Sequence, residues 1–149
     1  MTTLYLDMNI YNRPLDDQNQ MRIRLETTAI TMIFALIEQG RYSVHWSFVL
    51  DYENSRNPFP ERIHFVDQLA QVCQSTIGPN EEIKNLAGSL AEKQDVRGRD
   101  ALHIACAEHS GCDFLVTCDD RLVQQGTRLR EAGLLKVCVV NPIHLLAEV

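Results

Sequence analysis

The sequence contains no apolar run that approaches the roughly 20 residues a helix needs to span a bilayer, and its start lacks the positive charge and cleavage site of a secretory signal. These absences predict a cytoplasmic protein with no membrane partner. The chain also lacks internal repeats, low-complexity tracts and any Pro/Gly-rich linker. A chain of 149 residues without such a boundary is expected to fold as a single domain, residues 1–149.

The cysteines do not form a disulfide pattern. Their number, five, is odd, and none of them belongs to a Cys-x-x-Cys pair. Reduced and mostly buried thiols are therefore expected. A Gly-x-Gly-x-x-Gly motif is also missing after the first expected strand, which argues against a dinucleotide-binding enzyme.

Positive charge is scarce: 14 Lys and Arg residues stand against 20 Asp and Glu residues, which gives a net charge of −6. Because non-specific affinity for nucleic acid comes mainly from cations on phosphates, this balance counts against a broad nucleic-acid-binding surface. Most of the cations are arginine, the better bidentate phosphate ligand. A site built from carboxylates also raises the negative count, and bound divalent cations reverse its local sign.

Apolar periodicity and turn residues predict strands that alternate with helices along the chain. The expected strands are 3–6, 43–46, 113–117 and 137–140. The expected helices are 18–39, a segment after the cap Ser47 that carries Glu53, 60 to about 72, 79 to about 93, 100–109 and 121–125, whereas 11–17 is expected to be a loop. This alternation predicts an α/β fold with a mostly parallel sheet and helices on both faces.

Acidic residues follow the carboxyl ends of the expected strands. Asp7 ends the first strand, Asp119 lies just past the third, and Glu53 lies about two turns into the helix after the second. Ligands of open parallel sheets bind beyond these strand ends, so the three side chains are expected to converge. Asp100 starts a helix that precedes a strand, and its position in the sequence does not by itself place it beside the others.

Such a cluster predicts a metal site, because clustered like charges raise one another's pKa unless a cation is present. Oxygen ligands select hard cations such as Mg²⁺ or Mn²⁺. In two-metal sites the ions lie about 3.5–4 Å apart and clamp the attacking and leaving oxygens of a phosphoryl displacement. Carboxylates without a nearby histidine ligand suit that chemistry.

Four segments resemble, in order, the acidic motifs of PIN-domain nucleases. They are Leu6-Asp7-Met8-Asn9, the helix from Ser47 to Glu53, Asp100-Ala-Leu-His-Ile-Ala105 and Phe114-Leu-Val-Thr-Cys-Asp119. The chain is most similar to bacterial VapC-type toxins and their stand-alone relatives, and the resemblance covers nearly the whole chain. It implies a three-layer α/β/α fold, dependence on Mg²⁺ or Mn²⁺, cleavage of RNA by metal-activated water and a homodimer. It also implies an antitoxin protein as partner if the chain is the toxin of a toxin–antitoxin pair.

The resemblance also implies roles for single residues. Asp7, Asp100 and Asp119 match the metal ligands, and Glu53 matches a ligand or a residue that orients water. Asp51, two residues before Glu53, competes for that role.

Polar neighbours of these acids match supporting positions of the family. Asn9 matches the position that steadies the first acid, and Thr117 matches a hydroxyl beside the fourth. Arg99, next to Asp100, is a candidate phosphate contact. Arg13 is a second one, in a stretch where many relatives continue with an apolar helix and this chain is expected to form a loop.

Other interpretations of these residues compete with the nuclease. The acids could belong to a catalytically inactive PIN-like module that binds RNA or protein, or to an aspartyl-phosphate enzyme, although Asn9 stands where such enzymes carry a second Asp. Asp120 is expected to be a helix cap. The aromatic residues are expected to pack in the core rather than stack on bases: Tyr42, Trp46, Phe48 and Tyr52.

A series of alternating histidines and cysteines invites a zinc interpretation: His103, Cys106, His109 and Cys112. Each step of three residues rotates by about −60° on a helix, so only neighbouring members could share an ion. No complementary Cys-x-x-Cys pair exists. A zinc site is therefore not expected, and Cys106 is expected to be a core residue.

Overall fold

A computed structural model describes residues 1–147, and within this range five strands form one parallel sheet. The strands are β1 (Thr2–Leu6), β2 (Tyr42–Ser47), β3 (Ser75–Ile77), β4 (Phe114–Val116) and β5 (Cys138–Val140), in the order β3-β2-β1-β4-β5. The parallel sheet confirms the α/β class that the sequence predicts. The sequence missed β3, a three-residue edge strand.

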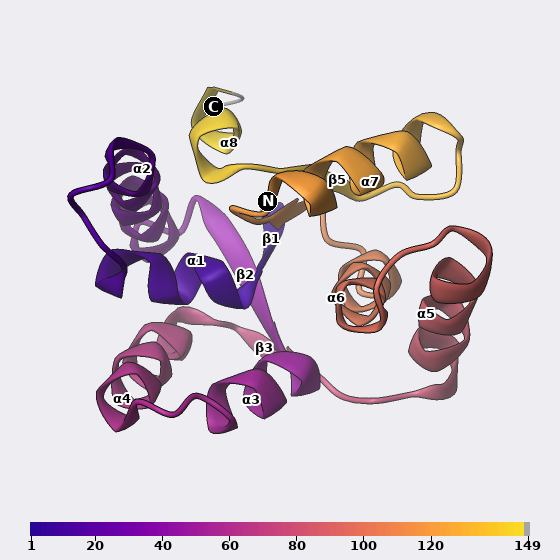
Figure 1. Ribbon diagram of the computed structural model, residues 1–149, viewed down its shortest axis with the longest axis horizontal. Coiled ribbons are helices and arrows are strands. Elements are labelled where there is room, and N and C mark those ends of the chain that lie inside the picture. Colours follow the sequence, from indigo (N-terminus) through magenta and orange to yellow (C-terminus); the bar gives the residue numbers. More distant parts are fainter. Residues whose placement is uncertain (148–149) are drawn as a thin grey trace.

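Helices cover both faces of the sheet, which confirms the three-layer α/β/α fold. They are α1 (Met8–Asn12), α2 (Met21–Glu38), α3 (Phe48–Ser55), α4 (Pro60–Leu69), α5 (Glu81–Lys93), α6 (Gly98–His109), α7 (Asp120–Glu131) and α8 (Pro142–Ala147), with short 3₁₀ turns η1 (Arg13–Leu15) and η2 (Ala70–Val72). In Figure 1, α2 and α8 lie on one side of the strands and α5 and α6 on the other. Within residues 1–147, no helix is long and apolar enough to cross a membrane.

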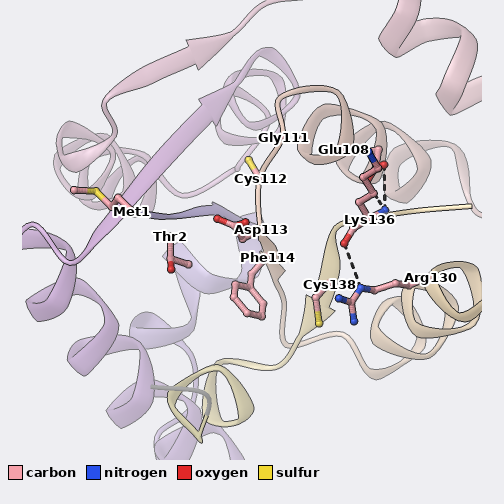
Figure 2. A pocket seen from close by; sticks show the side chains of 10 residues that line it. All are labelled: Met1, Thr2, Glu108, Gly111, Cys112, Asp113, Phe114, Arg130, Lys136 and Cys138. Atoms are coloured by element: carbon pink, nitrogen blue, oxygen red, sulfur yellow. Dashed lines mark hydrogen bonds between the residues drawn. The ribbon is translucent and has the colours of Figure 1, made fainter. Parts of the chain in front are cut away.

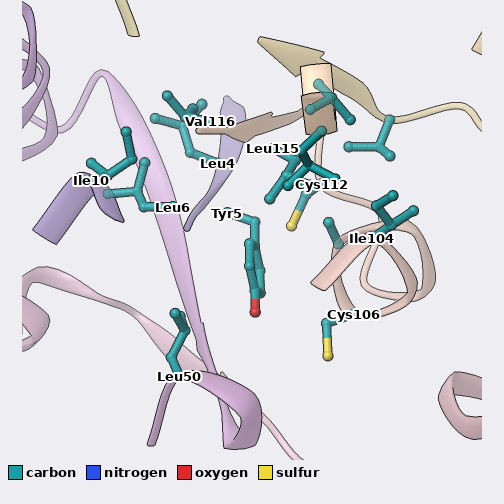
Figure 3. Close-up of a cluster of buried hydrophobic side chains, with 14 of the residues drawn as sticks. Leu4, Tyr5, Leu6, Ile10, Leu50, Ile104, Cys106, Cys112, Leu115 and Val116 are labelled. Carbon is teal, nitrogen blue, oxygen red and sulfur yellow. The ribbon is translucent and has the colours of Figure 1, made fainter. Parts of the chain in front are cut away.

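The central strand β1 is buried on both faces and joins two halves of the core. Leu4 and Leu6 point to one side of the sheet, and Tyr5 points to the other, toward Ile104 and Leu115 (Figure 3). This alternation follows from the two-residue period of a strand. Because both faces of a parallel sheet are covered, its central strands need apolar side chains at successive positions.

Polar side chains at strand ends cap the helices that follow. Asp7 accepts a hydrogen bond from the backbone N–H of Met8 at 2.7 Å and begins α1. Ser47 begins α3 by accepting the N–H of Leu50 at 3.2 Å, as the sequence predicts. Such a cap stabilises a helix by about 1 kcal/mol. The site residue Asp7 is therefore held in place by the local backbone.

Three sequence expectations about local structure are wrong. The stretch 11–17 is not a loop throughout: it continues α1 and then forms η1, because Ile10 and Tyr11 are fully buried on the inner side of this turn. The helix after Asp119 runs to Glu131 rather than ending near 125. The sequence also missed α8, the helix that packs against α2.

The strand order creates a switch point between β1 and β4. From β1 the chain moves outward to β2 and β3, then returns across the sheet to β4 and β5 on the other side of β1. The connections that leave β1 and β4 therefore run in opposite directions and leave a crevice at the carboxyl ends of these strands, where ligands of such sheets bind.

Candidate active site

Asp7 lies in the crevice at the switch point and is held by residues that follow β1 and β4. Its side chain is mostly buried, with 8% of the residue exposed. One oxygen, Oδ2, accepts hydrogen bonds from the Thr117 hydroxyl at 2.8 Å and from the Asn9 amide at 3.2 Å. The family resemblance implied that Asn9 steadies Asp7 and that Thr117 lies beside the fourth acid, and in the structure both side chains donate to Asp7.

Asn9 and Thr117 also tie the ends of β1 and β4 together. The Asn9 amide donates to the Thr117 hydroxyl at 3.1 Å, and its carbonyl oxygen accepts the N–H of Cys118 at 3.0 Å. The Thr117 hydroxyl accepts the N–H of Asp119 at 3.1 Å. These bonds fix the backbone from which both Asp7 and Asp119 project, so the two acids cannot move independently.

Glu53 reaches the crevice from α3, where it meets an unexpected partner, His103. The Nε2 atom of His103 lies 2.7 Å from Glu53 Oε1 and 3.6 Å from Asp7 Oδ1. The expectation of a carboxylate cluster without a nearby histidine is therefore wrong. The sequence did contain a signal: His103 lies three residues after Asp100 on one helix, and residues at this spacing share a face.

A buried chain of hydrogen bonds holds His103 in place. Its Nδ1 atom lies 2.7 Å from the Tyr5 hydroxyl, which in turn lies 2.7 Å from the hydroxyl of Ser47, the cap of α3. Tyr5 and Ser47 are fully buried and His103 is 1% exposed. Because each group is desolvated and paired, the imidazole has one orientation, with Nε2 directed at the carboxylates.

The electrostatics of the crevice show that its acids interact. Burial, and then the charges of Asp7 and Asp119, raise the pKa of Asp100 above its ordinary value. Burial lowers the pKa of His103, but the hydrogen bond to Glu53 and the negative charge of Asp7 outweigh it, so the net shift is upward. Negative charges contribute to the upward pKa shift of both groups, so the crevice has a negative potential that attracts cations.

The last two acids come from helix starts. Asp100 lies in the first turn of α6, although the cap of that helix is Arg97. Asp119 caps α7 by accepting the N–H groups of Arg121 and Leu122, and its residue is exposed. The expectation that Asp120 is the cap is wrong, because Asp120 instead forms an ion pair with Arg22 at 2.7 Å.

The donor set fits a divalent cation. Ligand atoms of Asp7, Glu53 and His103 all lie within 4.8 Å of one another. Carboxylate oxygens suit Mg²⁺ and Mn²⁺. The Nε2 atom of His103 is already hydrogen-bonded to Glu53, so this histidine holds the carboxylates in place. Asp100 lies close enough to Asp7 and Asp119 for their charges to raise its pKa, so all three carboxyls contribute to one region of negative potential.

The remaining candidate residues divide into those at the site and those elsewhere. Asp51 accepts a hydrogen bond from the Trp46 indole at 2.6 Å, so Glu53 and not Asp51 faces His103. Arg99 lies 3.6 Å from Glu53 and is at the site. Arg13 pairs with Asp16 at 3.1 Å and with the buried Glu26 at 3.3 Å, within a separate cluster of charges.

The His/Cys series does not assemble into one group. His103 joins the carboxylates, whereas His109 contacts Glu82 at 3.1 Å and Asn80 at 3.2 Å. Cys106 is fully buried, as expected of a core residue.

The aromatic side chains around β2 also separate. Tyr42 and Trp46 are buried and Phe48 packs against the core, as expected. Tyr52 is not a core residue, because 54% of it is exposed.

A larger cavity, of about 780 Å³, lies at the opposite edge of the sheet, where β1, β4 and β5 begin (Figure 2). Its acids are engaged by the backbone: Glu108 accepts the N–H groups of Lys136 and Val137, and Asp113 accepts the N–H of Thr3. The crevice at the carboxyl ends is therefore the candidate active site, although the cavity at the opposite edge has the larger volume.

The fold and the site define an α/β domain that gathers carboxylates at the switch point of a parallel sheet. The chain belongs to the PIN domain family, whose model matches residues 5–126. Proteins of this family are nucleases. The search of curated proteins gives no match.

Solved structures share the fold at low sequence identity. FitAcB from Neisseria gonorrhoeae has a TM-score of 0.63 at 15% identity, and the match covers 95% of this chain and 99% of that one. VapBC2 from Rickettsia felis, bound to a DNA fragment from its promoter, has a TM-score of 0.60 at 13% identity, with 94% and 98% covered. VapBC-1 from nontypeable Haemophilus influenzae has a TM-score of 0.59 at 16% identity, with 95% and 98% covered.

Proposed function

We propose that the chain is a divalent-metal-dependent endoribonuclease that hydrolyses phosphodiester bonds of RNA. The observation that carries the proposal is the convergence of Asp7, Glu53 and His103 at the switch point of the sheet, with Asp100 and Asp119 contributing negative charge to the same place. Membership of a nuclease family supports the reaction class.

Some side chains of the site would bind a cation, and others hold these ligands in position. Asp7, Asp100 and Asp119 would hold Mg²⁺ or Mn²⁺, and Glu53 would be a further ligand or would orient water. A bound divalent cation supplies activation of water and neutralisation of charge on the phosphate. The protein contributes rigidity, because Asp7 is fixed by Asn9 and Thr117.

His103 acts in this scheme as a positioning residue. Its imidazole joins Glu53 from α3 to Asp7 from the end of β1, so it sets the distance between the two carboxylates. Arg99, beside Glu53, is the arginine placed to contact the substrate phosphate. Arg13, the other predicted phosphate contact, is already paired with Asp16 and Glu26.

We extend the proposal to the setting of the enzyme. The neighbouring structures named VapBC support a toxin that pairs with an antitoxin protein. The proposal also includes a homodimer, which the family resemblance implies, and action in the cytoplasm. Co-expression with the protein encoded by the adjacent gene tests the pairing. A stable complex that suppresses cleavage supports it, and cleavage that is unaffected by the co-expressed protein contradicts it.

The test of the reaction compares the purified wild type with Asp7→Asn on unstructured and structured RNA, with Mn²⁺ and with a chelator. We expect wild type to cut RNA in Mn²⁺ and to leave 5′-phosphate ends, and the chelator or Asp7→Asn to abolish the cut. Equal cleavage by both proteins would contradict the site. RNA binding without cleavage by wild type would favour the inactive binding module.

A further inference from the structure

A shallow hollow opens directly from the candidate active site. It has a volume of about 360 Å³ and is lined by the end of α3, the turn between α3 and α4, and the start of α6. Glu53 forms one wall, so the hollow is continuous with the carboxylate cluster. The other walls carry Arg56, Phe59, Arg62 and Arg99, which makes this place basic and aromatic on a protein whose net charge is −6.

Two large aromatic side chains are exposed in this region. Tyr52 and Phe59 are each 54% exposed. Phe59 is held on a fixed turn, because the side chain of Asn57 accepts its N–H at 3.0 Å and Pro60 begins α4 directly after it. Leaving such rings in water gives up the stabilisation that burial of a large apolar side chain contributes, so a binding role is the natural explanation.

The arginines of the hollow are of two kinds. Arg62 is part of the scaffold, since it pairs with Asp16 at 3.0 Å and donates to the carbonyl oxygen of Leu15 at 2.9 Å. Arg56 and Arg99 instead gather over the ring of Tyr52, with their guanidinium carbons 5.7 and 6.0 Å from its centroid.

The two arginines over the ring keep donors for a ligand. Within residues 1–147, Arg56 makes no ion pair, and Arg99 has one long contact to Glu53 at 3.6 Å while 60% of its side chain is exposed. A ring that carries two guanidinium groups pre-organises them beside the active site, because each cation is attracted to the face of the ring.

We propose that this hollow, with Tyr52, Arg56, Phe59 and Arg99, binds the unpaired nucleotides that adjoin the cleaved bond of an RNA strand. Arg56 and Arg99 take phosphates, and an aromatic ring takes the face of a base. The inference rests on the proposed function, and it adds the residues of this chain that hold the strand beside the cleaved bond.

An unpaired strand fits the chemistry better than a duplex or a protein segment. Stacking on an aromatic ring needs an exposed base face, which a duplex hides between its base pairs. Guanidinium groups next to an exposed ring match the alternation of phosphates and bases along a strand, a pattern that a protein segment does not have. Duplex RNA and a protein partner are therefore outcomes of the test that would overturn the inference.

The experiment measures binding of a fluorescent oligouridylate by anisotropy, with Mn²⁺ present and in an Asp7→Asn background that leaves the strand intact. The variants are Phe59→Ala, Tyr52→Ala and Arg56→Gln. Matched controls are Leu134→Ala, an equally exposed apolar residue far along the chain, and Arg41→Gln, an exposed arginine at the start of β2.

The two kinds of contact give different signatures. Loss of a stacking ring should raise Kd about 5- to 150-fold without changing its salt dependence. Loss of the phosphate contact at Arg56 should reduce the slope of log K against log salt by about 0.7, the value for one single-strand phosphate. The control variants should bind as the Asp7→Asn parent does.

Each alternative result has a definite meaning. If Phe59→Ala, Tyr52→Ala and Arg56→Gln bind like the controls, or if the parent prefers a duplex of the same sequence, the inference is overturned. If wild type cleaves RNA while these three variants bind as the parent does, the proposed function stands and only this inference falls. If wild type cuts no RNA, the proposed function fails, while the anisotropy series still decides whether the hollow binds an unpaired strand.

Discussion

The buried pair of Glu53 and His103 leads to a quantitative prediction about stability. The two side chains meet at 2.7 Å, with 12% of the Glu53 side chain and 2% of the His103 side chain exposed. Replacing His103 by Leu removes the close partner of the Glu53 carboxylate, which then lies next to Asp7 with only the more distant Arg99 to balance its charge. Removing one member of a buried ion pair costs about 3–5 kcal/mol, and Arg99, at 3.6 Å from Glu53, places this pair at the lower end.

The expected loss of about 3 kcal/mol for His103→Leu corresponds to a fall in Tm of roughly 6–12 °C in a chain of this size. Replacing both partners by leucine should recover much of the loss, because no unpaired charge then remains. The assay is urea unfolding in a chelator, followed by the fluorescence of the single tryptophan, Trp46. The reasoning is refuted if the double variant loses the sum of the two single losses within about 0.5 kcal/mol, the signature of independent sites.

Three further predictions concern single residues. Asp100→Asn should leave the metal-free protein at least as stable as wild type in thermal melts at neutral pH. The reason is that burial and the charges of Asp7 and Asp119 raise the pKa of Asp100, so its charged form is unfavourable in the folded protein. A lower Tm of the variant would contradict the clustering of these acids. Glu53→Gln should reduce RNA cleavage at least tenfold whereas Asp51→Asn should not, because Asp51 contacts Trp46; equal losses in kcat would contradict this assignment. Gly126→Ala should cost about 1–3 kcal/mol, because its Cβ would overlap Val139, whereas Gly88→Ala in α5 should stabilise by up to about 1 kcal/mol; the two unfolding free energies check this.

The sequence predicts those strands and helices whose apolar pattern or capping residue is typical of one kind of element. β1 and β4 carry apolar residues at successive positions, β2 alternates apolar and polar residues, and Ser47 marks the start of α3. β3 could not be found because Ser75 and Thr76 are exposed on a three-residue edge strand that is held by pairing to β2. Pairing with β2 makes this segment a strand, and its three residues show no hydrophobic pattern from which a strand could be predicted.

Glycine and proline account for two of the other errors. Arg13-Pro14 has the composition of a turn, yet it continues α1 as a 3₁₀ turn because Pro is tolerated at its start. Gly126 lies inside α7, where it suggests a helix end, but it is needed because Val139 of β5 packs against the helix at that point. The burial of Ile10 and Tyr11 before the turn and the contact of Gly126 with Val139 are tertiary packing, which local propensity does not contain.

The candidate site was predictable only in part, for a related reason. The placement of Asp7, Glu53 and Asp119 follows from strand ends, and that of Asp100 follows from the family resemblance. The role of His103 depends on Glu53, 50 residues away, and on Tyr5, 98 residues away, so only the folded chain brings the three together. A short-range pattern therefore assigned this histidine to a His/Cys series that the structure separates.

The central claim is that the carboxylates at the switch point bind a divalent cation. It is tested most directly by titrating Mn²⁺ into the protein and measuring the free ion by electron paramagnetic resonance. We predict that wild type and Asp113→Asn, which alters an acid at the opposite edge of the sheet, deplete free Mn²⁺ equally, and that Asp7→Asn depletes little or none. Equal depletion by all three proteins would contradict the assignment of the site.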